Sequence, residues 1–242
     1  IVSERDNIYI SNKVKHIPFA FNEEVTKVFS DMIDRSVPGY KSSLNLMEVY
    51  GKKYCKPGNY IYDLGCSLGA VTEILLSCFS ATNKIIAVDS SESMINSCRK
   101  RFNAHIRNGE VELIKGDVRK IKLKESSFIA LNYLMQFLEI SERKDLLIKV
   151  FNSLGEGGVC ILSEKIHFTS FLKTKQINEL HYQFKSENGY SLMEIAQKRD
   201  ALEGVLATEI EEEHIKRLLG VGFRRVKKIM SNLNFVTFIC EK

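Results

Sequence analysis

Short apolar runs alternate with amphipathic segments along the middle of the chain. The runs have the length and the β-branched or aromatic content of buried strands, and they lie at residues 60–64, 84–88, 111–114, 128–132 and 159–162. Apolar residues between them recur at helical spacing. One helix is predicted over 91–101 after the capping pair Ser90–Ser91, and another from Ser141 to Leu154, ended by the glycines of 155–158. This alternation predicts a parallel sheet covered on both faces.

The C-terminal part of the chain departs from this pattern. A helix is predicted over 210–219 and a turn over 220–223, followed by strands at 226–230 and 235–240. The short, Asn-containing connection between these strands favours an antiparallel hairpin. The pattern as a whole predicts a doubly wound α/β fold. Its sheet has seven strands, is mostly parallel, and has one antiparallel strand near its edge.

Two segments lie outside the alternation. Residues 1–57 contain all three prolines of the chain, and we interpret them as an N-terminal helical cover. Residues 164–205 are polar, and we expect a helical insertion before the last helix that serves as a lid or a dimer element. A length of 242 residues fits one α/β domain with insertions, so residues 1–242 are expected to form a single domain.

Composition narrows the class of protein. Apolar residues make up 44% of the chain and charged residues 27%, which excludes a disordered tail, a collagen-like fibre and a low-complexity scaffold. The net charge is +5 and no run of five Lys or Arg occurs. This charge is compatible with steering of an anionic substrate, but no direct contact with nucleic acid is expected.

The cysteines and the apolar runs bear on compartment and cofactors. The 6 cysteines form no C-x-x-C pair and no histidine stands at zinc-finger spacing, so we expect reduced thiols and no metal. No signal peptide is visible, and no run approaches the ~18 apolar residues of a membrane span. We therefore expect a cytoplasmic protein without a membrane partner.

The segment 63–70, Asp-Leu-Gly-Cys-Ser-Leu-Gly-Ala, lies where the first strand turns into a helix. Ligands of doubly wound folds bind at such carboxyl ends of strands. A nicotinamide dinucleotide fingerprint fits Gly65 and Ala70, but Ser67 replaces the glycine that lets backbone approach a pyrophosphate. The segment also matches the nucleophile elbow G-x-S-x-G, yet no HGGG-type oxyanion element precedes it and His214 lies inside a predicted helix.

A third interpretation, an S-adenosylmethionine site, explains more of the sequence. This ligand needs a glycine turn for its amino-acid part, an acid after the next strand for the ribose, and a polar residue after the third strand for the adenine. Asp89 ends the second strand, close to the ~20 residues after Gly65 expected for a ribose acid, and Asp117 ends the third. Both aspartates also occur as ordinary turn residues, but three features in register favour the ligand.

Beyond these motifs, the chain resembles the carboxy-S-adenosyl-L-methionine synthases over nearly its whole length. The resemblance is carried by the segments 29–40, 62–70, 136–139, 141–143, 162–165, 188–190 and 197–199. It implies a Rossmann-like class I methyltransferase sheet. It also implies conversion of S-adenosyl-L-methionine and prephenate to carboxy-S-adenosyl-L-methionine and phenylpyruvate, in a homodimer. A separate tRNA carboxymethyltransferase would then use the product to modify a wobble uridine.

The resemblance also implies a set of ligand-binding residues. They are Tyr40, Gly65, Cys66, Ser67, Asp89, Ser90, Asp117, Val118, Asn132 and Arg199. Ser90 departs from the Asn familiar in the family, which puts one side-chain contact in doubt. No protein base is identified, since the hydroxyl group that leaves prephenate can take the methyl proton.

Arg199 is the candidate catalytic residue, because a new carboxylate in a closed pocket needs a fixed cation. It would act in its own site or across a dimer. The alternative is a surface arginine paired with Asp200 or Glu203. Two other functions stay open, an ordinary S-adenosylmethionine-dependent methyltransferase and a non-catalytic S-adenosylmethionine-binding module. An amino-group methylase is disfavoured because the segment 132–135, Asn-Tyr-Leu-Met, lacks prolines.

Overall fold

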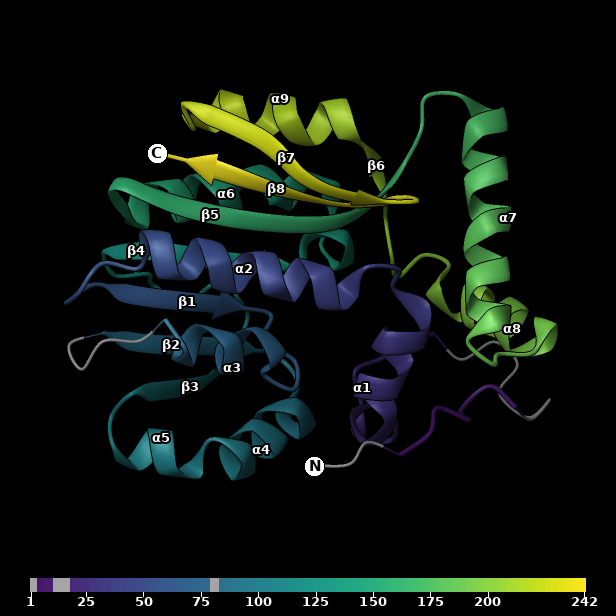
Figure 1. Cartoon of the computed structure of the whole chain (residues 1–242), viewed down its shortest axis with the longest axis horizontal. Coiled ribbons are helices and arrows are strands. Elements are labelled where there is room, and N and C mark those ends of the chain that lie inside the picture. Colours follow the sequence, from purple (N-terminus) through teal and green to yellow (C-terminus); the bar gives the residue numbers. More distant parts are fainter. Residues whose placement is uncertain (1–3, 11–17, 79–82) are drawn as a thin grey trace.

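The computed structural model describes residues 4–10, 18–78 and 83–242. Its strands are β1 (Tyr60–Leu64), β2 (Lys84–Asp89), β3 (Val111–Lys115), β4 (Ser126–Asn132), β5 (Leu154–His167), β6 (Glu209–Ile210), β7 (Arg225–Asn232) and β8 (Phe235–Glu241). They form one sheet in the order β3-β2-β1-β4-β5-β8-β7, and the short β6 pairs with β5 off this path (Figure 1). The path contains the seven strands predicted from the sequence.

The helices are α1 (Glu23–Ser36), α2 (Tyr40–Tyr54), α3 (Ala70–Leu76), α4 (Glu92–Arg101), α5 (Asn103–Arg107), α6 (Ile140–Ser153), α7 (Phe171–Glu187), α8 (Leu192–Leu202) and α9 (Glu211–Val221), with a 3-10 turn at Met135–Phe137. Strands β1 to β5 run parallel, whereas β8 is antiparallel to both of its neighbours, β5 and β7. This confirms the single reversed strand and the C-terminal hairpin.

Alternate residues of the central strands pack on opposite faces of the sheet, as the period of a strand dictates. On one face, Leu64 and Leu131 join a core with Leu147 of α6 and Leu218 of α9. On the other face, Ile61 packs with residues of α2 and α3, such as Met47 and Leu75. Both faces are therefore covered, which explains why the central strands are apolar throughout.

Several predicted boundaries were wrong. Strand β5 begins at Leu154, so the glycines of 155–158 lie in the strand rather than ending a helix. Ser141 lies inside α6, whose N-cap is Glu139. Strand β5 starts as early as Leu154 because this residue pairs in parallel with Ser126 of β4. Helix α9 begins at Glu211 because Glu209 and Ile210 pair with β5, and it extends to Val221, two residues into the expected turn of 220–223.

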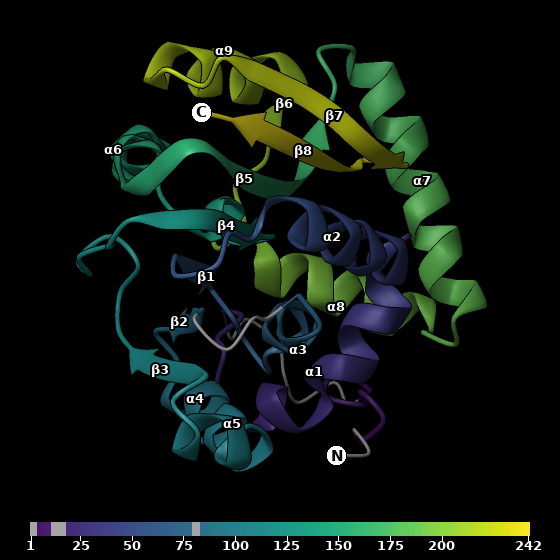
Figure 2. The same ribbon diagram turned by 60° about the vertical axis from the view of Figure 1, so that its left-hand side comes forward.

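The expected helical insertion is shorter than predicted. β5 continues to His167, because residues such as Glu164 and Lys165 pair with Val236 and Phe235 of β8. The helical part consists of α7 and α8. In Figure 1 and Figure 2, these helices and α1 lie beyond the carboxyl ends of β1 and β4. In the N-terminal cover α1 and α2 are helices, while residues 1–3 and 11–17 lie outside the described part.

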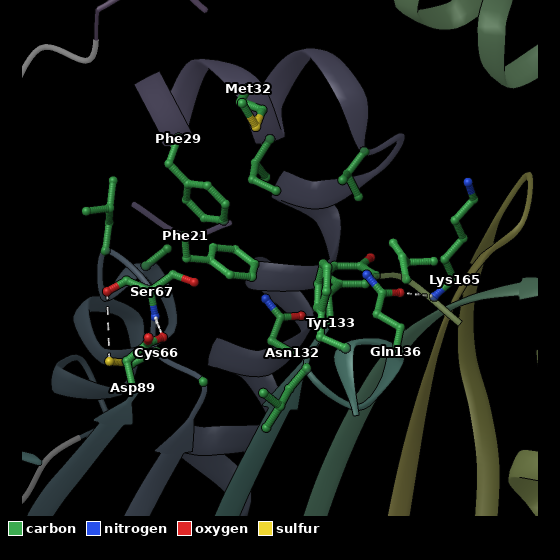
Figure 3. A pocket seen from close by; sticks show the side chains of 18 of the residues that line it. Phe21, Phe29, Met32, Cys66, Ser67, Asp89, Asn132, Tyr133, Gln136 and Lys165 are labelled. Atoms are coloured by element: carbon green, nitrogen blue, oxygen red, sulfur yellow. Dashed lines mark hydrogen bonds between the residues drawn. The ribbon is translucent and has the colours of Figure 1, made fainter. Parts of the chain in front are cut away.

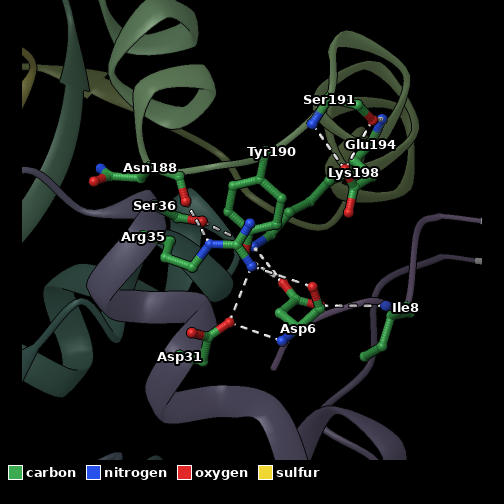
Figure 4. Close-up of polar contacts among 10 residues, drawn as sticks. All are labelled: Asp6, Ile8, Asp31, Arg35, Ser36, Asn188, Tyr190, Ser191, Glu194 and Lys198. Atoms are coloured by element: carbon green, nitrogen blue, oxygen red, sulfur yellow. Dashed lines mark hydrogen bonds and ion pairs between the residues drawn. The ribbon is translucent and has the colours of Figure 1, made fainter. Parts of the chain in front are cut away.

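A buried polar cluster fastens the N-terminal segment to α1 and α8 (Figure 4). The Asp6 backbone N–H donates to Asp31 Oδ2 at 2.7 Å, and the Tyr190 hydroxyl donates to Asp6 Oδ2. Lys198 Nζ lies 3.7 Å from the same carboxylate oxygen, and Arg35 bridges Asp31 and the Asp6 carbonyl. Each buried charge in this cluster has an opposite partner, which is the condition for burying it at low cost. No helix in the described ranges is both long and apolar enough to cross a membrane.

Candidate active site

The carboxyl ends of β1 to β4 open into a cavity of about 590 Å³. Helices α1 and α8 contribute residues to its wall, among them Met32 and Lys198. Figure 3 shows Phe21, Phe29 and Met32 lying over the space above the strand ends. Apolar side chains on this side favour exclusion of water from a bound ligand.

The turn after β1 brings backbone close to the cavity. Gly65 and Gly69 both have positive φ, +79° and +77°, a region that glycine enters without strain. A Cβ at Gly65 would stand 2.8 Å from the Leu134 side chain. Ser67 also has a positive φ of 47°, so its backbone is held in a conformation that side-chain-bearing residues rarely adopt. The turn thus presents backbone groups, as the amino-acid part of a ligand requires.

Asp89 ends β2 and faces the same cavity. Its Oδ2 accepts the Ser67 backbone N–H at 2.9 Å, and its Oδ1 accepts that of Ser91 at 2.8 Å. Burial raises the pKa of this carboxyl, while the backbone donors, including that of Ser90, oppose the rise. A carboxylate offers about four acceptor sites, so part of its accepting capacity remains free beside the backbone donors. The carboxylate is therefore oriented to accept hydrogen bonds from the hydroxyl groups of a ligand.

The residues expected around an adenine lie at the ends of β3 and β4. Val118 is buried and lines the cavity. Asp117 also lines it, but Arg119 Nη2 donates to Asp117 Oδ2 at 2.7 Å and holds the pKa of that carboxyl at about 2. Asn132 Oδ1 is buried without a hydrogen-bond partner in the described structure. Tyr40 lines the cavity from α2, where its ring centroid lies 6.4 Å from that of Tyr133, and burial raises the pKa of its hydroxyl.

Sequence reasoning missed Asp63 as a site residue. Its Oδ2 accepts the backbone N–H of Thr72 at 2.9 Å and its hydroxyl at 2.7 Å. The other oxygen, Oδ1, is buried in the cavity wall without a partner among the described residues. Burial raises the pKa of Asp63 to about 7. A cationic ammonium group placed here would supply the missing donor. The signal in the sequence that could have identified Asp63 is a lone acid in an apolar strand.

Relatives decide the family of the chain. A family model for a methyltransferase domain matches residues 61–158. A carboxy-S-adenosyl-L-methionine synthase of Shewanella sp. (strain MR-7) is 40% identical over 241 residues, covering 99% of each chain. The synthase of Escherichia coli (strain K12) is 38% identical over 242 residues, covering 100% of this chain and 98% of the relative. The chain belongs to the carboxy-S-adenosyl-L-methionine synthase family.

The members of this family are transferases. The chain has the fold of S-adenosylmethionine-dependent methyltransferases. The structure of human N-acetylserotonin methyltransferase in complex with SAM superposes with a TM-score of 0.60 and 13% sequence identity, covering 91% of this chain and 55% of the other. At that identity the likeness concerns the fold alone. Among the described residues, no group of three or more His, Cys, Asp or Glu could hold a metal ion.

For this carboxy-S-adenosyl-L-methionine synthase family member, the cavity unites all but one of the predicted ligand-binding residues. Those that line it are Tyr40, Gly65, Cys66, Ser67, Asp89, Ser90, Asp117, Val118 and Asn132. Arg199 does not line it. The Arg199 side chain is 58% exposed and its Nη2 lies 2.9 Å from Asp200 Oδ1. In a single chain Arg199 thus has the local surface pair given above as the alternative, and a role within its own site has no support from this geometry.

Four basic side chains at the other end of the cavity escaped the sequence reasoning. Lys165, His181, Lys185 and Lys198 all line the wall. Burial lowers the pKa of Lys185 to about 7 and that of Lys165 to about 8, and for Lys185 the neighbouring lysines add to this. The His181 Nε2 donates to the Ser36 carbonyl at 2.7 Å, and burial lowers the pKa of this ring to about 2. The signal in the sequence was weak, because these residues lie on β5, α7 and α8.

Proposed function

We propose that the chain converts S-adenosyl-L-methionine and prephenate to carboxy-S-adenosyl-L-methionine and phenylpyruvate. The observation that carries the proposal is one cavity that joins an S-adenosylmethionine-type turn to a cluster of basic side chains. The full-length similarity to synthases of this name supports it. S-adenosylmethionine acts here as a substrate, and its methyl carbon receives the carboxyl group.

The reaction balances without a further reagent. As its ring becomes aromatic, prephenate releases carbon dioxide and hydroxide and becomes phenylpyruvate. The hydroxide takes one proton from the methyl group beside the sulfonium, which forms water, and the methyl carbon bonds to carbon dioxide. The contribution of the protein is to hold both substrates together and to exclude bulk water. Apolar residues such as Phe21, Phe29 and Met32 are suited to this exclusion.

Each end of the cavity has its own role in the proposal. Asp89 accepts the ribose hydroxyls, the turn from Gly65 to Ser67 holds the amino-acid part, and Asp63 receives its ammonium group. Asp117, Val118 and Asn132 surround the adenine, with Tyr40 and Ser90 beside the ligand. The Ser90 side chain is shorter than the Asn that is familiar at this position in the family, so it would reach less far toward the ligand.

We also propose a homodimer in which Arg199 reaches the neighbouring site. Its exposed position at the end of α8 leaves it available to another chain. The exposed side chains of Phe171, Leu172, Leu180 and Leu192 on α7 and α8 support an interface on these helices. Arg199 would then bind the new carboxylate. The neighbouring sulfonium balances the charge of this buried carboxylate only in part, so a further cation is needed.

The wider context is proposed on the same basis. The chain would work in the cytoplasm, without binding nucleic acid or membranes itself, and without a metal. Its product would supply a separate tRNA carboxymethyltransferase that modifies a wobble uridine. The modest net charge of +5 is compatible with a protein that handles small molecules and leaves RNA to its partner.

Incubation of the purified protein with both substrates, followed by mass spectrometry, tests the proposed reaction. The expected products are phenylpyruvate and a derivative of S-adenosylmethionine that is heavier by one carbon dioxide. An ordinary methyltransferase, which the methyltransferase-domain match keeps as second candidate, would instead release S-adenosylhomocysteine in the presence of a methyl acceptor. If no carboxylated product forms although intact prephenate is present, the proposal is contradicted.

A further inference from the structure

Buried cations in the described part of the chain differ in whether they have an anionic partner. Arg143 Nη1 lies 2.6 Å from Glu209 Oε2, and Arg35 Nη1 lies 3.0 Å from Asp31 Oδ2. Lys198 Nζ has Asp6 at 3.7 Å and the Ser36 hydroxyl at 3.0 Å. These cations are satisfied within the fold, as buried charges must be.

Lys165 and Lys185 are the exceptions. The Lys185 residue is only 6% exposed, and Lys165 is half-buried on β5. Among the described residues their ammonium groups make no hydrogen bond or ion pair. The Lys185 Nζ lies 5.9 Å from the centre of the Tyr182 ring, and the Lys165 Nζ lies 5.8 Å from that of Phe235. Two unpaired ammonium groups in one cavity wall are costly unless a bound anion satisfies them.

S-adenosylmethionine is not that anion. Its one carboxylate belongs to the amino-acid part, which the proposed function places at the turn from Gly65 to Ser67. Its sulfonium and ammonium groups would be repelled by a lysine pair nearby. Figure 3 shows Ser67 and Asp89 at one side of the cavity and Lys165 at the other, with Asn132 and Tyr133 between them. The lysines therefore face the space left beyond the S-adenosylmethionine part of the cavity.

The chemistry decides which carboxylate of a dicarboxylate co-substrate belongs here. A carboxylate that leaves as carbon dioxide loses its charge in the transition state, so a cation bound to it would stabilise the ground state and slow the reaction. A carboxylate that is retained loses nothing by binding a cation. The lysine pair suits the retained group, and the departing one would then point toward the sulfonium.

We propose that Lys165 and Lys185 form the subsite for the retained carboxylate of the co-substrate, a small anion with more than one carboxylate. The assignment of this carboxylate to the pyruvyl group of prephenate rests on the proposed function. The subsite itself rests on the two unpaired ammonium groups and the cavity that they share. Phenylpyruvate keeps that carboxylate and serves as a stable probe.

The test is calorimetric titration of phenylpyruvate into protein saturated with S-adenosylmethionine, using Lys165→Met and Lys185→Met. Methionine keeps the apolar stem and removes the charge. Lys144→Met is the matched control, because Lys144 is exposed on α6. Each cavity variant should bind phenylpyruvate at least about tenfold more weakly, as expected for loss of a charge-assisted contact. The control should bind as the unaltered protein does, and Lys165→Arg should retain binding.

The outcomes separate this inference from the proposed reaction. S-adenosylmethionine affinity should be unchanged or improved in both cavity variants; if they lose both ligands, the lysines are structural and the subsite is wrong. Unchanged phenylpyruvate binding in the variants, or no binding to the unaltered protein, also overturns it, even when carboxylated product forms. Lysine-dependent phenylpyruvate binding supports the subsite even if prephenate is not turned over, in which case the proposed reaction alone fails.

Discussion

The carboxylate of Asp89 accepts the backbone N–H of Ser67 at 2.9 Å, so the end of β2 and the glycine turn after β1 are held as one unit. This bond orients the two groups that the proposal assigns to the ribose and to the amino-acid part of the ligand. It also helps to fix Ser67 at a positive φ. Changes on either side of this bond are expected to have different consequences.

Asp89→Ala should weaken S-adenosylmethionine binding by at least about tenfold, because the ribose would lose charge-assisted hydrogen bonds of roughly 1.5–3 kcal/mol each before solvent compensation. Calorimetry measures the affinity, and circular dichroism checks that the fold survives. Asp89→Asn keeps one of the two acceptors for the Ser67 and Ser91 N–H groups and removes the charge, so its affinity should lie between those of the unaltered protein and Asp89→Ala. Unchanged affinity in the alanine variant would remove Asp89 from the binding site.

Ser67→Ala should reduce ligand binding only modestly, because the turn acts through backbone groups. Ser67 is not expected to be a nucleophile, since none of the described histidines is hydrogen-bonded to it. Hydrolysis of a simple aryl ester by the unaltered protein, abolished in Ser67→Ala, would favour the nucleophile-elbow interpretation instead.

Arg199→Ala should weaken binding of carboxy-S-adenosylmethionine and leave binding of S-adenosylmethionine unchanged or slightly improved. The reason is that only the product carries the extra carboxylate. Calorimetry with the two ligands makes the comparison. Equal loss of both would make Arg199 structural.

The cross-dimer version of this role has its own test. Subunits with Asp89→Ala are mixed with subunits with Arg199→Ala to form heterodimers. If Arg199 acts across the dimer, one site of each heterodimer has both residues intact, and activity should be regained on mixing. If Arg199 acts in its own chain, no site is complete and mixing should restore nothing.

Asp63 should make the free energy of unfolding depend on pH. Burial raises its pKa from 3.8 to about 7, so the folded chain holds this proton where the unfolded chain releases it. The contribution of Asp63 to stability should therefore decline as pH rises from about 4 to about 7. Urea unfolding at several pH values should show this decline, and Asp63→Asn should make it smaller. An identical slope in the variant would contradict the assignment.

The sequence could predict the features that depend on local residue patterns, but not those that depend on how distant segments pack. The turn at Gly65 and the acids Asp89 and Asp117 follow directly from strand ends, so their convergence is a consequence of the parallel sheet. The length of β5 escaped prediction because it depends on pairing with β8. Lys165 and Lys185 lie on β5 and α7, and only the packing of α7 beyond the sheet brings them to one cavity wall. The exposure of Arg199 likewise depends on where α8 lies.

The most direct test of the central claim follows the ring carboxyl group of prephenate. Prephenate with a heavy-carbon label in that group is incubated with the protein and S-adenosylmethionine, and the products are separated and weighed by mass spectrometry. The account predicts that the label appears in carboxy-S-adenosylmethionine and is absent from phenylpyruvate. Release of all the label as free carbon dioxide, with S-adenosylmethionine unchanged, would contradict it.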